Sequence, residues 1–502
     1  MGPDRKRRLI ILALLLAPLV TLHVLHAPRR GPFSNDPSYY LQVARHVATG
    51  DGLMSSVSLY HEGLTPLPQP YDLYPLWPLL LGAVAKIAGL IAAGNILPQL
   101  FFVLDLYLIY VLTNRLAGDA AIFRFREESM DVGHLVVLLV ALNFIFFEAT
   151  TIPYTEGLAF ALALGSFLLL DSNPGLSGLL AGLSVLTRYQ MLVVPVATVF
   201  VLAVATLWAR KYLLTLGAYA LTAGVVVGGW LLYANFHRPH RADIPPFELW
   251  VHPASLAARV GQGLRGLGVA FNPGSEYSYF HSFGPVVLAT LAIGWLRSRN
   301  VTLAAVFMTG VASTFLLATL EWNLAPRWLF GSRHSLAFVF MLIPALVVAA
   351  VSAPRMVRLV VLLLVAGSIV QGAMAVLRDP IPEGSGLSAA ENQMVRWLAE
   401  RQPQATILTT NAQALSVYAP NNFHWTGCAV DPAKTRLMLQ RLPIDHVVVY
   451  DYERSCPFVR GLDDLLETEA TFGDTFHRVY LLRVMRKITR TGAPSTRHTA
   501  SG

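Results

Sequence analysis

The residues best suited to chemistry are acidic side chains placed where helices are expected to begin. Asp36 follows the first membrane-length apolar run and stands directly before Pro37. An aspartate before a proline is typical of a helix start, with the aspartate as the cap and the proline at the first helical position. The next apolar residues recur with helical spacing and precede Gly50: Tyr40, Val43, Ala44 and Val47. The pattern predicts an amphipathic helix with a carboxylate at its start; the alternative is that Asp36 only caps it.

A second carboxylate has a similar setting. Glu156 follows Pro153 and opens the apolar run 157–170. The dipole of a helix favours an anion at its N-terminus, so a functional carboxylate and a plain first-turn glutamate are both consistent with this position.

Two cationic sites interrupt or open apolar segments. Arg188 interrupts the longest apolar region, where an unpaired arginine costs a few kcal/mol. We therefore expect Arg188 to pair with a carboxylate, to bind an anionic ligand or to reach the membrane surface. Arg333 and His334 open a later apolar run. A guanidinium beside an imidazole suits a phosphate or diphosphate group, and an interfacial anchor is the alternative.

Further polar residues gather in two loops expected on the outer face. The first could face the same cavity as Asp36 and contains His61, Glu62, Tyr71 and Asp72. The second could line an acceptor site and contains Asn272, Glu276, Tyr277, Tyr279 and His281. The sequence contains no P-loop, no GxSxG, no HExxH and no paired CxxC.

The composition is that of a protein with many membrane spans. Of the 502 residues 54% are hydrophobic and 14% charged, against about 25% charged in soluble domains. Mean hydropathy is +0.52. The net charge of +8 does not point to nucleic acid, because the basic residues cluster in short loops between apolar runs, as the positive-inside rule expects.

The apolar runs predict an α-helical polytopic membrane protein with about 11 spans. The N-terminal run follows Arg5–Arg8 and lacks a cleavage site, which indicates an uncleaved signal anchor in the inner or plasma membrane. A further run, 74–93, is expected to be interfacial or re-entrant, because a full crossing would move later basic loops outside. The N-terminus is then cytoplasmic and the C-terminal region extracytoplasmic. The expected spans are 9–26, 97–114, 132–149, 154–170, 175–188, 189–208, 212–236, 283–296, 301–320, 334–352 and 356–377.

We expect a transmembrane catalytic domain over 1–377, with a first outer loop at about 27–96, and a small extracytoplasmic α/β domain over 378–486. In the second domain, helices are expected at 389–401, 412–418, 432–442 and 458–466, and strands at 405–409, 446–450 and 477–484. Cys428 and Cys456 could pair there or remain thiols. The basic tail 487–502 is expected to be disordered.

Several motifs follow one another over about 1–380: Asp36-Pro37-Ser38-Tyr39-Tyr40, Ala44-Arg45, Gly50-Asp51-Gly52, Tyr74-Pro75-Leu76-Trp77-Pro78, Tyr154-Thr155-Glu156, the glycine-rich run 178–188 ending in Thr187-Arg188, and Arg333-His334. In order and spacing they resemble the GT-C superfamily of membrane glycosyltransferases, in particular bacterial relatives of protein O-mannosyltransferases and aminoarabinose-lipid A transferases. The chain lacks the Asp-Glu pair that O-mannosyltransferases have at the first acidic site, and no lysine clearly matches the one near the proline-rich stretch of the aminoarabinose enzymes.

This resemblance implies transfer of a sugar from a polyprenyl-phosphate donor to a lipid, glycan or protein acceptor on the extracytoplasmic face, with inversion. By the same analogy the catalytic residues are Asp36, as the general base or as a carboxylate that orients the acceptor, and Glu156 at the second acidic site. Arg188 or Arg333 would steady the departing phosphate. Some relatives use a divalent metal, for which Asp36 and Glu156 would be Mg or Mn ligands. Substrate-binding residues would include Tyr39, Tyr40, His61, Glu62, Tyr71, Arg188, Arg333 and His334.

Other functions are compatible with a lipid-linked sugar. A transporter or flippase would favour inverted repeats and charges near mid-membrane, and no repeat is evident. An O-antigen polymerase or ligase usually relies on external arginines rather than an aspartate in the first outer loop. A scaffold without enzymatic activity would not require Asp36 and Glu156 at these positions.

Overall fold

The computed structural model describes residues 3–30, 35–58, 66–71, 73–117, 121–125, 128–237, 300–319, 336–351, 353–378, 387–474 and 478–485. The chain divides into two compact units. The helical unit comprises Met1–Ser55 and Pro70–Gly386, and the α/β unit comprises Ser56–Gln69 and Leu387–Gly502. The α/β unit therefore includes part of the segment 27–96, which the sequence predicted as the first outer loop.

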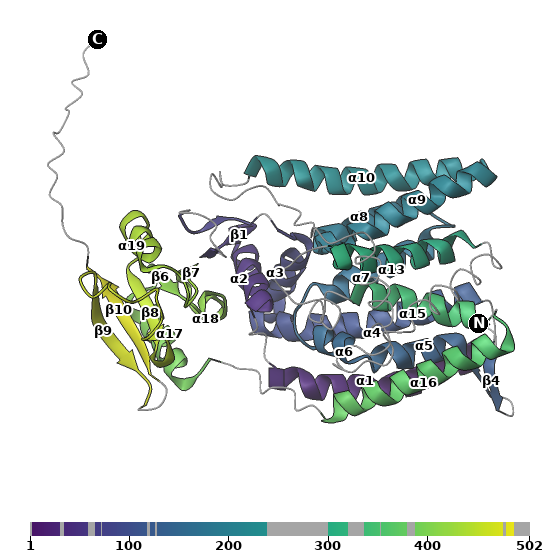
Figure 1. The fold of residues 1–502 in the computed structure, drawn as a ribbon, viewed down its shortest axis with the longest axis horizontal. Helices are drawn as coiled ribbons and strands as arrows, with labels where there is room; N and C mark the ends of the chain where they lie inside the picture. The colour runs from purple at the N-terminus through teal and green to yellow at the C-terminus, as the bar shows by residue number, and fades with distance from the viewer. Residues whose placement is uncertain are drawn as a thin grey trace, which may run out of the picture. The chain divides into compact units, whose positions relative to one another are not determined.

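The helical unit contains the helices α1 (Pro3–Arg30), α2 (Asn35–Thr49), α3 (Leu76–Ala88), α4 (Leu90–Ala117), α5 (Val132–Ala141), α6 (Phe144–Thr151), α7 (Glu156–Leu169), α8 (Pro174–Thr187), α9 (Val193–Trp208), α10 (Tyr212–His237), α13 (Val301–Thr319), α15 (Leu336–Val351) and α16 (Arg355–Arg378), with the 3-10 turn η1 (Tyr189–Leu192) and the short strands β1 (Met54–Ser55), β3 (Gln69–Pro70), β4 (Ala121–Phe125) and β5 (Glu128–Asp131). The longest helices, among them α1, α4, α10 and α16, run alongside one another, whereas α2 and α3 lie across them (Figure 1).

The helices confirm a polytopic membrane protein. Among the described residues five helices are long and apolar enough to cross a membrane, or six if the pair α5 and α6, bent by 66°, is one span. Exposed leucines along α10, such as Leu214 and Leu232, are consistent with contact to lipid. The total of about 11 spans stays a prediction, and the expected span 283–296 lies outside the described residues.

Helix breaks divide three apolar stretches, of which 74–93 was expected to be interfacial or re-entrant and 175–208 was expected as the two spans 175–188 and 189–208. The run 74–93 is divided at Gly89 (φ 88°) between α3 and α4, and the 13 residues of α3 reach only about 20 Å. The run 132–149 bends at Leu142–Asn143, where the Asn143 side chain accepts a hydrogen bond from Phe146 N and starts a new helix. The region 175–208 forms α8 and α9, separated at Arg188.

Glycines let α8 pack closely against α10. A Cβ at Gly178 would lie 2.2 Å from the Tyr219 carbonyl oxygen, and one at Gly182 would lie 2.8 Å from Val226 Cβ. Such small residues allow helix backbones to approach in a membrane protein, where packing replaces the hydrophobic effect. The glycine-rich stretch before Arg188 is therefore a packing surface.

The α/β unit contains a six-stranded sheet in the order β2-β7-β6-β8-β10-β9. The first four strands are parallel, and β10 pairs antiparallel with both β8 and β9. Its strands are β2 (Val57–Ser58), β6 (Thr406–Thr409), β7 (Asn422–Trp425), β8 (His446–Tyr450), β9 (Leu466–Phe472) and β10 (Val479–Val484), and its helices are α17 (Ala389–Arg401), α18 (Ala412–Tyr418) and α19 (Pro432–Arg441), with the 3-10 turn η4 (Asp451–Glu453). These elements confirm the predicted α/β region.

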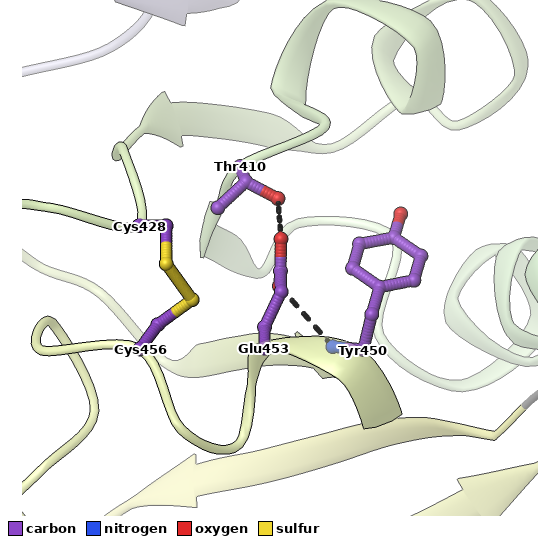
Figure 2. The surroundings of a disulfide bond; sticks show 5 residues. All are labelled: Thr410, Cys428, Tyr450, Glu453 and Cys456. Atoms are coloured by element: carbon purple, nitrogen blue, oxygen red, sulfur yellow. Dashed lines mark hydrogen bonds between the residues drawn. A yellow bond between two sulfur atoms is a disulfide. The ribbon is translucent and has the colours of Figure 1, made fainter.

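One expected helix of this unit is wrong. Residues 458–466 form turns, and the strand β9 begins at Leu466. Gly461 (φ 70°) adopts a left-handed conformation that an α-helix does not accommodate. The cysteines do pair: Cys428 and Cys456 form a disulfide close to Glu453, which accepts hydrogen bonds from the Thr410 hydroxyl and from Tyr450 N (Figure 2).

Candidate active site

The centre of the candidate site is a buried ion pair. Arg188 Nη1 donates to Glu156 Oε1 at 2.6 Å, and the two residues are 7% and 1% exposed. The Thr155 hydroxyl accepts from Arg188 Nη1 at 3.3 Å and donates to Glu156 Oε2 at 3.2 Å. Gln190 Oε1 accepts from Arg188 Nε at 2.8 Å. The sequence expectation that Arg188 would pair with a carboxylate is confirmed.

Both residues of the pair stand at helix interruptions. Glu156 is the first residue of α7, and Arg188 is an extended residue (φ −161°) between α8 and η1. Both α7 and α8 have 14 residues and so reach about 21 Å, which is shorter than a hydrocarbon core of about 30 Å. In membrane proteins, irregular backbone between such short helices occurs where it is buried in protein or lines a cavity.

An aromatic cluster adjoins Arg188. The Tyr189 hydroxyl donates to the Leu73 carbonyl oxygen at 3.2 Å and accepts from Trp230 Nε1 at 3.1 Å. The Tyr74 ring meets the Tyr189 ring edge-on at 4.8 Å, and the Tyr71 hydroxyl donates to the Tyr74 carbonyl oxygen at 3.4 Å. The cluster therefore links the first outer loop to the interruption at Arg188.

The same cluster extends to α2, the helix that carries Asp36. Tyr39 lies 5.7 Å from Tyr71 and 6.5 Å from Tyr40, measured between ring centroids, and all three rings are buried. Burial raises the pKa of Tyr71 well above its usual value, with further contributions from Tyr40 and Tyr39. Tyr71 therefore remains a neutral hydrogen-bond donor at physiological pH.

Gly94 of α4 lies close both to α2 and to the segment before Glu156. A Cβ built on Gly94 of α4 would lie 3.2 Å from Leu41 Cδ2 and 3.7 Å from Pro153 Cγ. The Pro153 carbonyl oxygen also accepts from Trp77 Nε1 at 2.9 Å. Residues that are far apart in sequence thus meet around the start of α7, although the sequence gives no sign of the Gly94 contact.

Asp36 lies in the first turn of α2, which begins at Asn35, and it is half-buried. Asp36 therefore lies within the first turn and not at the position before the helix, where the sequence predicted it as the cap, and a carboxylate in the first turn still benefits from the helix dipole. Gly50 (φ 94°) follows the end of the helix, as the sequence predicted. Ten residues singled out in the sequence lie outside the described residues: His61, Glu62, Asp72, Asn272, Glu276, Tyr277, Tyr279, His281, Arg333 and His334.

The described residues do not fit a divalent metal held by Glu156. One of its oxygens is bonded to the Arg188 guanidinium, so a positive group already occupies the position of a cation. No three histidine, cysteine, aspartate or glutamate side chains in the described part of the chain are grouped to hold a metal ion. We derive no step through a metal.

The sequence analysis overlooked Asp105. It lies in the middle of α4, is fully buried, and has two oxygens without a hydrogen-bond partner among the described residues. The available signal was a lone carboxylate inside the apolar stretch Phe101–Tyr110, where an ionisable residue is costly.

Two solved structures share the fold of nearly the whole chain. The crystal structure of ArnT from Cupriavidus metallidurans bound to undecaprenyl phosphate matches 94% of this chain and 98% of that protein, with a TM-score of 0.58 and 14% identity. The cryo-EM structure of the arabinofuranosyltransferase AftD from Mycobacteria matches 94% of this chain and 40% of that protein, with a TM-score of 0.52 and 13% identity. No protein-family model and no curated protein matches the chain.

Proposed function

The chain has the GT-C fold of membrane glycosyltransferases, and from this premise we propose that it transfers a sugar from a polyprenyl-phosphate donor to a lipid, glycan or protein acceptor on the extracytoplasmic face. The observation that supports the proposal is the buried Arg188–Glu156 pair at two helix interruptions. Tyrosine side chains connect this pair to α2, the helix that carries Asp36. ArnT, which shares the fold, was solved with undecaprenyl phosphate bound.

Arg188 is suited to the phosphate of the donor. Its guanidinium is fixed by Glu156, Thr155 and Gln190 before any ligand arrives, so little side-chain entropy is lost on binding. Charge that develops on a departing phosphate is stabilised strongly by a fixed cation in a site from which water is excluded. Glu156 then acts by positioning Arg188.

Asp36 is suited to activating the acceptor. Its carboxylate takes the proton of an acceptor hydroxyl while that oxygen attacks C1 of the sugar. The bond between C1 and the phosphate oxygen breaks, and the electron pair leaves with the polyprenyl phosphate, whose charge Arg188 offsets. A single displacement of this kind inverts the configuration at C1. Tyr39 and Tyr40, which belong to the same helix as Asp36, and the neighbouring Tyr71 supply neutral hydroxyl groups and aromatic rings.

The test is a transfer assay in membranes that contain the chain. Radiolabelled sugars are supplied linked to undecaprenyl phosphate and, in a parallel assay, as nucleoside diphosphate sugars. We expect label to move to an acceptor only from the lipid-linked sugar. Transport of the labelled lipid across the bilayer without transfer would support a flippase instead.

A further inference from the structure

Asp105 is an unusual residue in the helical unit. It is 0% exposed, and within the described residues neither carboxyl oxygen has a hydrogen-bond partner. Buried polar groups are hydrogen-bonded in the great majority of cases, and an unpaired carboxylate in a membrane span costs several kcal/mol. A neutral carboxylic acid costs less in such surroundings than a carboxylate, and its hydroxyl can donate a hydrogen bond.

Asp105 faces the start of α7. A Cβ built on Gly157 would lie 3.8 Å from Asp105 Oδ2 and 2.8 Å from Phe101 Cβ. Gly157 directly follows Glu156, the partner of Arg188. The lack of a side chain at residue 157 thus lets α4 approach the helix start that carries the ion pair.

Asp105 lies about midway along α4. It is fifteen residues beyond Leu90, the start of α4, which corresponds to about 22 Å along the helix. The same α4 segment also contacts α3 and the residues before Glu156, because the Phe101 ring lies 5.9 Å from that of Trp77, which donates to the Pro153 carbonyl oxygen.

We propose that Asp105 is a further binding residue for the lipid-linked donor, and that its protonated carboxyl donates a hydrogen bond to a phosphate oxygen of the donor beside Arg188. This inference rests on the proposed function. The phosphate supplies an acceptor that no described residue provides for Asp105, and a neutral donor adds to the guanidinium without adding a second buried charge.

The variants Asp105→Leu and Asp105→Asn test the proposal in the full-length protein in nanodiscs. Leucine removes an unpaired polar group, so Asp105→Leu is expected to melt at a higher temperature than the wild type without ligand. Its Kd for undecaprenyl phosphate is expected to rise about 10- to 100-fold, the value of a hydrogen bond to a charged group. Asp105→Asn keeps a donor and is expected to bind within about threefold of the wild type.

Thr113→Val is the matched control, since the Thr113 hydroxyl is also buried in α4 and has no hydrogen-bond partner among the described residues. It should leave Kd unchanged. Undecaprenol, which lacks the phosphate, should bind wild type and Asp105→Leu equally. Unchanged binding of undecaprenyl phosphate by Asp105→Leu, a loss of folding in that variant, or equal weakening by leucine and asparagine would each overturn the inference. If the wild type does not prefer the phosphate to the alcohol, the proposed function itself fails.

Discussion

Arg188 and Glu156 stabilise the fold as well as the site, because each neutralises the other's buried charge. We predict that Arg188→Met lowers the free energy of unfolding by about 3–5 kcal/mol, since it leaves the carboxylate of Glu156 buried without a cation. Adding Glu156→Gln should recover much of this loss. Thermal unfolding of the two single variants and the double variant measures the coupling, and simple additivity of the two costs would contradict the ion pair.

His424 gives the α/β unit a defined dependence on pH. It is fully buried in β7, its Nδ1 lies 3.1 Å from the Ser58 hydroxyl, and burial lowers its pKa to about 4. In the unfolded chain the His424 imidazole takes up a proton near pH 6.5, whereas in the folded chain it stays neutral until the pH falls to about 4. Stability is therefore fully present above about pH 6.5 and is lost progressively as the pH falls toward 4.

We predict that His424→Gln reduces the loss of unfolding free energy at acid pH. For the wild type this loss amounts to about 3 kcal/mol by pH 4. Limited proteolysis of the full-length protein between pH 7 and pH 4.5 measures it. The other titratable groups are the same in both proteins and cancel in the comparison. An identical pH profile for variant and wild type would exclude His424 as the cause.

At the residue scale, sequence reasoning identified groups whose type is costly in their surroundings. Arg188 was conspicuous because a cation interrupts an apolar region, and its partner was correctly expected to be a carboxylate. Asp105 has the same signal but was masked by the strong hydropathy of its neighbours. The partnership of Tyr39 with Tyr71, or of Trp77 with Pro153, depends on packing between distant segments that no local pattern reveals.

At the element scale, close contact between α8 and α10 depends on glycine. We predict that Gly178→Ala lowers the melting temperature, because its Cβ would meet the Tyr219 carbonyl oxygen at 2.2 Å and backbone atoms cannot move aside cheaply. The expected cost is about 2 kcal/mol, in the range of an overpacked core. Gly224→Ala on α10 is the control, since nothing lies within 4 Å of its Cβ, and it should not lower the melting temperature. Equal effects of the two variants would argue against this packing.

Element types followed from the sequence where one signal dominated. Helical periodicity predicted α2, and Gly50, whose φ is positive in the structure, marked its end. Continuous apolar runs predicted α1, α10 and α16. The bend between α5 and α6 was missed because the apolar run continues through Leu142 and the capping role of Asn143 depends on local geometry. The helix expected at 458–466 failed because the left-handed Gly461 falls within it.

At the scale of the whole molecule, composition was enough to predict a polytopic membrane protein with a small α/β region. Composition could not show that Ser56–Gln69 belongs to the α/β unit, because pairing of β2 with β7 joins residues more than 350 positions apart. Alternating strands and helices indicated the α/β class, whereas the strand order is set by long-range pairing.

Replacement of Asp36 is the most direct test of the account. Asp36→Asn preserves the size of the side chain and removes its capacity to take a proton, so transfer from a polyprenyl-phosphate sugar should fall about 100-fold or more. Asp51→Asn, at an exposed carboxylate just beyond the same helix, should stay within a fewfold of the wild type. Equal rates of transfer by wild type and Asp36→Asn, at equal expression, would contradict the central claim that Asp36 activates the acceptor.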